Sequence, residues 1–457
     1  MSAVLASQAT PPPAKTRRRL ILCLDGTWNT ADGEEITNIV RLRDMLQPGV
    51  TDGVEQRIYY DEGVGTRGGL DTYLGGGMGR GLDVNVRQAY RFLSRFYEKG
   101  DEIYIFGFSR GAFTARSLAG YIGATGLLHR DNCTRENEEA TWLHYRTDTK
   151  DRYPKDGLRL ARLCHENLRI RTLGVFDTVG SLGIPLDAAD WLTGRRSQYQ
   201  FHDTTLSSVI DHSLQALAID EMRRFFPPSL WQVPQHANFT TVEQVWFPGV
   251  HSDIGGGYGA GGIGAVTLDW MLNRIDTLNA GAGQASLSFR PGHRPAPSGA
   301  APVAIHESRH GWRSILSNRE PSLRVIAQQR PPDKGYTLAA LPPHAKPLGE
   351  YVHLSALERL MGGNNAKGEA YRPRNLAFAL EQFFAPAHVA LAHPTVDLGF
   401  MGDAGPLDWL NDPADFARLQ SAMPPEHHPA LATARANWVQ PPTPHPASQP
   451  AAASPAP

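Results

Sequence analysis

Short runs of apolar residues, each followed by a polar loop that contains Gly or Asp, recur through the first 280 residues. Continuous apolar runs of this length are typical of central strands in a parallel sheet, because such strands are buried on both faces. The pattern predicts strands at 20–24, 57–60, 103–106, 168–176 and 243–247.

Segments with helical spacing of apolar residues lie between these strands. The spacing predicts helices over 38–42, 82–98, 214–222 and 268–275. Thr37 is expected to cap the first helix, and Pro227 and Pro228 are expected to end the third. Strands that alternate with helices predict an α/β fold: an α/β-hydrolase-like, mostly parallel sheet flanked by helices.

The character of the chain changes along its length. Residues 1–16 and 440–457 are rich in Pro and small residues and are predicted to be disordered. Residues 17–280 hold the strand and helix pattern and are predicted to form the catalytic domain. Residues 281–439 have fewer strand signals and predict a loop-rich, mainly helical region packed on that domain, with short helices near 312–316, 354–361 and 376–384.

Charge and cysteine content exclude several classes of protein. The 457 residues carry a formal net charge of −1, which gives no electrostatic footprint for a nucleic-acid partner. The three cysteines are far apart and form no C-x-x-C pair, so neither a disulfide framework nor a zinc site is expected. The apolar run Leu20–Leu24 is too short for a signal-peptide core or a membrane span. These features predict a cytoplasmic protein, or one exported by a signal-independent system.

The most informative motif is Gly107-Phe108-Ser109-Arg110-Gly111. It follows a predicted apolar strand and precedes a predicted helix that has small residues on one face. A serine on such a sharp strand-to-helix turn has its hydroxyl exposed, and the glycines let the two backbones pass closely. A bare match to this motif is weak, but the strand before it and the helix after it are the context that a nucleophile requires. We therefore expect Ser109 to be a catalytic nucleophile.

An activated serine needs a base and an acid that orients the base. Asp177 follows the strand at 168–176 and His251 follows the strand at 243–247, in the chain order Ser, Asp, His that α/β-hydrolases use. Alternatives stay open: Asp253 as the acid, or His353 or His212 as the base. Asp253 and Asp25 together are also a candidate cation site.

The oxyanion of the reaction needs backbone donors. The N–H of Arg110, directly after the nucleophile, is the expected first donor. A second donor is expected from Gly26 or Thr27, at the end of the first strand. Asp25 is expected to organise that loop. This chemistry requires no metal or other cofactor.

Four motifs together carry a resemblance to a known family. They are Leu24–Trp28, Gly107–Ala112, Val175–Gly180 and Phe247–Gly257, with Tyr371–Leu376 similar to a late motif of the same family. The chain resembles, over about 18–280, the α/β-hydrolase family of uncharacterised bacterial and fungal proteins that includes phospholipase effectors of type VI secretion. The resemblance implies Ser109 as nucleophile, Asp177 as acid and His251 as base.

The resemblance also implies partners. For the effector members it implies cleavage of phospholipid esters, hence a lipid or other ester substrate and transient contact with a membrane surface. A secretion or immunity partner would fit the same role. This chain departs from those members because it is compact and has no long membrane-inserting module.

Two other functions compete with the serine hydrolase. Leu24-Asp25-Gly26-Thr27 suggests a magnesium-dependent phosphatase of the haloacid-dehalogenase type. That chemistry needs an aspartate two residues before Asp25, where this chain has Cys23. The other is a non-catalytic binding module that has kept the fold. The presence of a serine, an aspartate and a histidine at all three expected catalytic positions argues against it.

Overall fold

The computed structural model describes most of the predicted catalytic domain and part of the region beyond residue 280. The described residues are 17–26, 36–63, 78–147, 151–179, 206–223, 226–231, 241–258, 262–294, 304–308, 321–327, 337–338, 349–388 and 398–437. The predicted disorder of 1–16 and 440–457, the predicted helix near 312–316 and Thr27 lie outside these residues.

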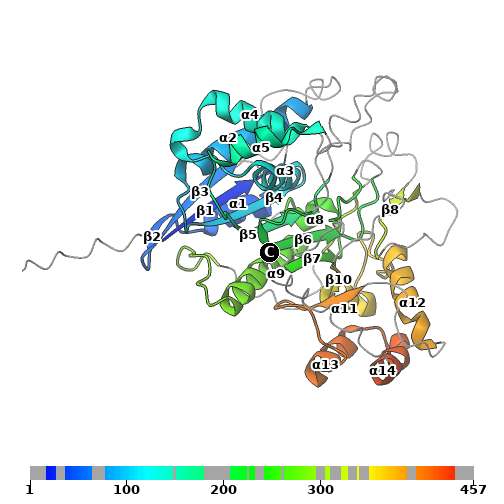
Figure 1. The fold of residues 1–457 in the computed structure, drawn as a ribbon. Helices are drawn as coiled ribbons and strands as arrows, with labels where there is room; N and C mark the ends of the chain where they lie inside the picture. The colour runs from blue at the N-terminus through cyan, green and yellow to red at the C-terminus, as the bar shows by residue number, and fades with distance from the viewer. Residues whose placement is uncertain are drawn as a thin grey trace, which may run out of the picture.

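A large, mostly parallel sheet forms the centre of the molecule (Figure 1). Its strands are β1 (Arg17–Leu24), β2 (Gly49–Thr51), β3 (Val54–Asp61), β4 (Glu102–Phe108), β5 (Ile170–Phe176), β6 (Ile210–Ala218), β7 (Thr241–Phe247), β10 (Glu350–His353) and β11 (Gly399–Met401). Within the described residues their order is β11-β10-β7-β6-β5-β4-β1-β3-β2, and of these neighbours β2 and β3 are antiparallel. The predicted α/β-hydrolase-like fold class is confirmed, and every strand predicted from the sequence is present.

Helices cover both faces of this sheet. They are α1 (Asn38–Met45), α2 (Met78–Phe96), α3 (Arg110–Thr125), α4 (Arg135–Arg146), α5 (Pro154–Ala161), α8 (His251–Gly255), α9 (Gly262–Gly281), α11 (Leu354–Gly362), α12 (Arg374–His388), α13 (Pro413–Ala422) and α14 (His428–Asn437). Thr37 caps α1 as predicted, since its hydroxyl accepts a hydrogen bond from the Val40 N–H.

Alternate residues of the central strands pack against different sets of helices, as the period of a strand requires. Leu20 and Leu22 of β1 lie in one apolar core with residues of α2 and α3. Ile21 and Cys23 lie in another core, with residues of α1, α9 and the helices α11 to α14. The sheet is therefore buried on both faces, which explains the continuous apolar run Leu20–Leu24 in β1.

One predicted helix is wrong. The residues around Leu214, Leu217 and Ala218 form β6, a buried parallel strand between β5 and β7. Their apolar spacing fits a helix, but a strand with both faces buried needs no alternation of apolar and polar residues, so spacing alone cannot separate the two.

The region beyond residue 280 both extends and covers the sheet. β10 pairs with β7, and β11 pairs with β10. α11 and α12 confirm the predicted helices near 354–361 and 376–384, and Figure 1 shows α12, α13 and α14 gathered near β10, away from α2 to α5. The helical character of this region is confirmed, whereas the domain boundary at 280 stays a prediction. A short parallel pair, β8 (Ser322–Leu323) with β9 (Thr337–Leu338), also lies there.

Candidate active site

Ser109 stands between β4 and α3 in a strained backbone conformation. Its φ is 57° and its ψ is −118°, a region that residues with a side chain rarely adopt. A Cβ on Gly107 would meet the Ala112 backbone at 2.6 Å, and a Cβ on Gly111 would overlap the backbone carbonyls of Leu24 and Asp25. Both glycines therefore allow the close approach that the sharp turn at Ser109 requires.

Neighbouring strands bring the candidate side chains to one edge of the sheet. β1, β4, β5, β6 and β7 are consecutive in the sheet and parallel, so their carboxyl ends lie side by side. Ser109 follows β4, Asp177 follows β5 and His251 follows β7. The Ser109 N–H donates to the Phe176 carbonyl, 3.1 Å away, which fixes the serine beside the strand that carries Asp177.

The three side chains form a continuous hydrogen-bonded relay. His251 Nε2 lies 2.9 Å from Ser109 Oγ, and His251 Nδ1 lies 2.6 Å from Asp177 Oδ2. All three residues are buried, with Asp177 fully so. This is the geometry in which an imidazole can take a proton from a serine while a carboxylate fixes its tautomer.

The Asp177 carboxylate accepts three hydrogen bonds besides its contact with His251. Oδ1 accepts from the Ala218 N–H at 2.9 Å and from Arg324 Nη1 at 2.6 Å, and Oδ2 accepts from Arg324 Nη2 at 2.9 Å. Burial by itself would raise the pKa of Asp177, but the Arg324 charge and His251 outweigh burial and hold the pKa well below its ordinary value. Asp177 is therefore a carboxylate at any pH at which the protein works.

Aromatic rings and an acid surround the imidazole of His251. The ring centroids of Phe108 and Phe226 lie 4.8 Å and 5.0 Å from that of the imidazole, and the backbone N–H of His251 donates to Glu221 Oε2 at 3.2 Å. Burial lowers the pKa of His251 and outweighs the opposing effect of Asp177. The imidazole is consequently neutral near pH 7, which is the form that accepts a proton.

The predicted oxyanion donors differ in how the structure places them. Arg110 is the first residue of α3, where backbone N–H groups point out of the helix end beside Ser109. The Gly26 N–H lies 2.7 Å from Asp25 Oδ1, to which it donates, and Thr27 lies outside the described residues. Asp25 also accepts from Thr37 Oγ1 at 2.7 Å and from the Tyr60 hydroxyl at 3.2 Å, so it ties its loop to α1 and β3.

The alternative acid and bases occupy other places. Asp253 accepts hydrogen bonds from the Val250 N–H at 2.9 Å and from His306, whose Nδ1 lies 2.6 Å from Asp253 Oδ1. His212 lies within β6, and His353 pairs through Nδ1 with Ser355. Within the described residues, no group of three or more His, Cys, Asp or Glu side chains is placed to hold a metal ion.

A family model matches the part of the chain that contains these residues. Residues 18–274 match the model described as "T6SS, Phospholipase effector Tle1-like, catalytic domain", a match that spans more than half of the chain and contains all three relay residues. The chain belongs to the Tle1-like effector family. The predicted family is thereby confirmed.

One similar protein and two similar solved structures share between 17% and 32% of their aligned residues with the Tle1-like chain. "Uncharacterized protein YEL023C" of Saccharomyces cerevisiae is 32% identical over 232 aligned residues, and the match covers 46% of this chain and 32% of the yeast protein. An uncharacterized protein from Pseudomonas aeruginosa of known structure is 17% identical, with a TM-score of 0.33, and the match covers 62% of this chain and 48% of the other. A Tle1 effector, solved bound to the VgrG spike of the type VI secretion system, is 20% identical with a TM-score of 0.28, over 53% and 52% of the two chains. The Tle1-like chain thus spans about half of those solved chains and a third of the yeast protein.

Sequence reasoning missed several neighbours of the relay in the Tle1-like chain. Glu221 follows β6, so a strand prediction there would have drawn attention to it. Arg324 and Phe226 lie outside every motif, and no local signal distinguishes them. The late motif does reach the site: Tyr371 donates to Asp220, and Asn375 Nδ2 donates to the carbonyls of Ile219 and Arg324.

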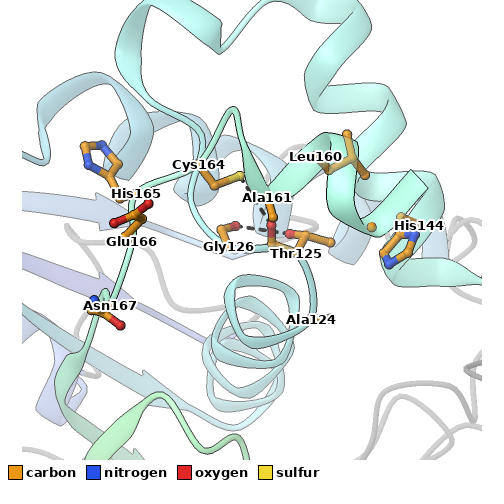
Figure 2. A pocket seen from close by; sticks show the side chains of 11 residues that line it. Ala124, Thr125, Gly126, His144, Leu160, Ala161, Cys164, His165, Glu166 and Asn167 are labelled. Atoms are coloured by element: carbon orange, nitrogen blue, oxygen red, sulfur yellow. Dashed lines mark hydrogen bonds between the residues drawn. The ribbon is translucent and has the colours of Figure 1, made fainter. Parts of the chain in front are cut away.

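A separate pocket lies at the far end of α3 from Ser109. It has a volume of about 430 Å³, and Figure 2 shows side chains of α4, α5 and the segment after α5 around it, including His144, Cys164 and His165. Burial raises the pKa of the Cys164 thiol to about 12, so this cysteine stays protonated and is no second nucleophile.

None of the helices in the part of the Tle1-like chain that the structure describes has both the length and the apolar character needed to cross a membrane.

Proposed function

We propose that this chain is a serine hydrolase that cleaves carboxylic esters, with phospholipid or other lipid acyl esters as its substrates. The observation that carries the proposal is the relay from Asp177 through His251 to Ser109, at 2.6 Å and 2.9 Å. Membership of a phospholipase effector family supports lipid as the source of the ester.

The proposed reaction has two halves. His251 Nε2 takes the proton of Ser109 Oγ as that oxygen bonds to the ester carbonyl carbon, and backbone N–H groups, with Arg110 as the first, stabilise the oxyanion. When this tetrahedral intermediate collapses, the bond between the carbonyl carbon and the leaving oxygen breaks, and the leaving oxygen receives the proton from His251. A water then attacks the acyl-serine by the same route, releases the fatty acid and returns the proton to Ser109. Asp177 holds the imidazole in one tautomer throughout.

The test is labelling of the purified protein with a fluorophosphonate, which reacts with activated serines. We expect wild type to be labelled and Ser109→Ala to be unlabelled, with release of fatty acid from phospholipid vesicles lost in the same variant. Folded wild type that takes no label would contradict the proposal and favour the binding module. Labelling without any lipid cleavage would keep the serine hydrolase and reject the lipid substrate.

The family supports two further proposals, about location and partners. The proposed location is outside the producing cell, after delivery by a type VI secretion apparatus. The proposed partners are a membrane surface, with which the chain makes transient contact, and an immunity protein, which binds it in the cell that makes it. Retention of a tagged chain in the cytoplasm of a cell with an active apparatus would argue against export and favour the cytoplasmic location.

A further inference from the structure

Arg324 reaches the relay from the region beyond residue 280. Its guanidinium forms a two-pronged ion pair with Asp177, Nη1 to Oδ1 at 2.6 Å and Nη2 to Oδ2 at 2.9 Å. The same two nitrogens also donate to the carbonyls of Ala218, at 3.0 Å, and Phe226, at 2.8 Å. Arg324 is 2% exposed, so these bonds are shielded from water.

The burial of Asp177 makes such a partner necessary. An ionised carboxylate removed from water is stable only when it is paired and hydrogen-bonded, and a neutral imidazole with one backbone N–H supplies no positive charge. A guanidinium supplies both the charge and two parallel donors. Because the fork and the carboxylate are planar, the pair also fixes the rotation of the carboxylate, leaving Oδ2 directed at His251 Nδ1.

Arg324 is itself held in place. Asn375, at the start of α12, donates to the Arg324 carbonyl at 3.2 Å and to the Ile219 carbonyl at 3.0 Å. Residues of the region beyond 280 therefore connect the end of β6 to the carboxylate at the end of β5.

We propose that Arg324 is a positioning residue of the relay: it fixes the Asp177 carboxylate against His251, and so makes the region beyond residue 280 part of the catalytic apparatus. The proposal rests on the proposed serine hydrolase. It also assigns a role to a segment that no sequence motif marks.

A positioning role predicts an effect on pH dependence that loss of packing would not produce. Among the residues that the structure describes, the charged or titratable groups around His251 are Asp177, Arg324, Glu221 and Arg223. Without Arg324, the Asp177 charge is no longer balanced and attracts a proton to His251 more strongly. The acidic limb of the activity profile then moves to higher pH.

The experiment measures the rate of fluorophosphonate labelling of Ser109 between pH 4.5 and 9 in the full chain. The variants are Arg324→Lys and Arg324→Ala. Arg274 provides the matched control, because it is similarly buried and pairs through two nitrogens with Glu243, at 2.9 Å and 2.6 Å, away from the relay. Arg274→Lys and Arg274→Ala therefore report the cost of breaking a buried ion pair as such.

We expect Arg324→Ala to lower the labelling rate by about 10²-fold, the loss that a displaced catalytic group produces, and to shift the acidic limb upward. Arg324→Lys is expected to keep part of the rate. Guanidinium ion at a sub-denaturing concentration is expected to restore the rate of Arg324→Ala and to have no such effect on Arg274→Ala. In an Asp177→Asn background, Arg324→Lys should cause no further loss, since both residues act through one imidazole.

Several outcomes would overturn the proposal. Folded Arg324→Lys and Arg324→Ala with wild-type rates and pH profiles would show that Asp177 needs no such partner. An equal loss in the folded Arg274 variants would show a general effect of stability. An absence of labelling in wild type is a different result, because it rejects the serine hydrolase itself.

Discussion

The hydroxyl of Tyr371 donates a hydrogen bond of 2.9 Å to the buried carboxylate of Asp220. The same carboxylate oxygen accepts from the Gly249 N–H, at 2.5 Å, in the loop that leads to His251. Through Asp220, the late motif at 371–376 therefore contacts the loop that leads to His251. Burial raises the pKa of Asp220 to about 7, more than these donors lower it, so this carboxyl takes up a proton within the working pH range.

Asp220 predicts a fall in stability as the pH rises. The folded protein holds the Asp220 proton more tightly than the unfolded chain, whose carboxyl has the ordinary pKa of 3.8. The contribution of Asp220 is therefore fully present below about pH 4 and is lost as the pH rises through about 7, at no more than about 1.4 kcal/mol per pH unit. Urea unfolding of wild type and Asp220→Asn at several pH values gives this contribution as the difference between the two.

The difference in free energy of unfolding between wild type and Asp220→Asn reports on Asp220 alone, because the other groups that titrate are the same in both proteins. Asn keeps an oxygen that accepts from Gly249 and Tyr371 and has no proton to lose. Asp177, whose pKa is lowered, contributes a constant amount above its ordinary pKa of 3.8. A difference that does not change between pH 4 and 7 would mean that Asp220 is charged in the folded state throughout.

His251 predicts the position of the acidic limb of the activity profile. The imidazole must be neutral to accept the Ser109 proton, and burial lowers its pKa below the ordinary 6.5. kcat/KM for a short-chain p-nitrophenyl ester should therefore rise with pH and reach half its maximum below pH 6.5. A midpoint well above pH 6.5 would show that the effect of Asp177 on the pKa of His251 outweighs that of burial.

Asp177→Asn should lower kcat for the same ester by about 10⁴-fold.

Gly255 predicts a packing cost next to the relay. A Cβ at this position would overlap the ring of Phe108, which itself lies against His251. Gly255→Ala should destabilise the fold by about 1–3 kcal/mol and lower activity, because the ring has to move. Gly281→Ala is the control: no atom lies within 4 Å of its added Cβ, and its stability should stay within about 1 kcal/mol of wild type. Equal melting temperatures for the two variants would contradict the predicted overlap.

Metal removal separates the serine hydrolase from the phosphatase. Asp25 accepts hydrogen bonds from Gly26, Thr37 and Tyr60, which suits a residue that organises a loop. Ester hydrolysis and labelling of Ser109 are expected to survive dialysis against EDTA without loss. A magnesium-dependent phosphatase activity that is abolished by Asp25→Ala and retained by Ser109→Ala would reverse this assignment.

Local sequence predicted the class of fold and selected Ser109, Asp177 and His251 for the relay, although it left Asp253, His212 and His353 open as alternatives. Ser109, Asp177 and His251 each follow an apolar strand, and parallel strands place their carboxyl ends at one edge, so local pattern and chain order could select them. The capping of α1 by Thr37 was predictable for the same reason, because a helix cap is decided within three residues.

Features that depend on burial and on distant pairing required the three-dimensional structure. The residues around Leu214 form β6 because β5 and β7 hydrogen-bond to its two edges and both of its faces are buried, whereas its apolar spacing on its own fits a helix equally well. Arg324 meets Asp177 across 147 positions of sequence, and no local pattern encodes such a contact. The partner of a buried charge is selected by the space that the whole fold leaves beside it, and for that reason it could be found only in three dimensions.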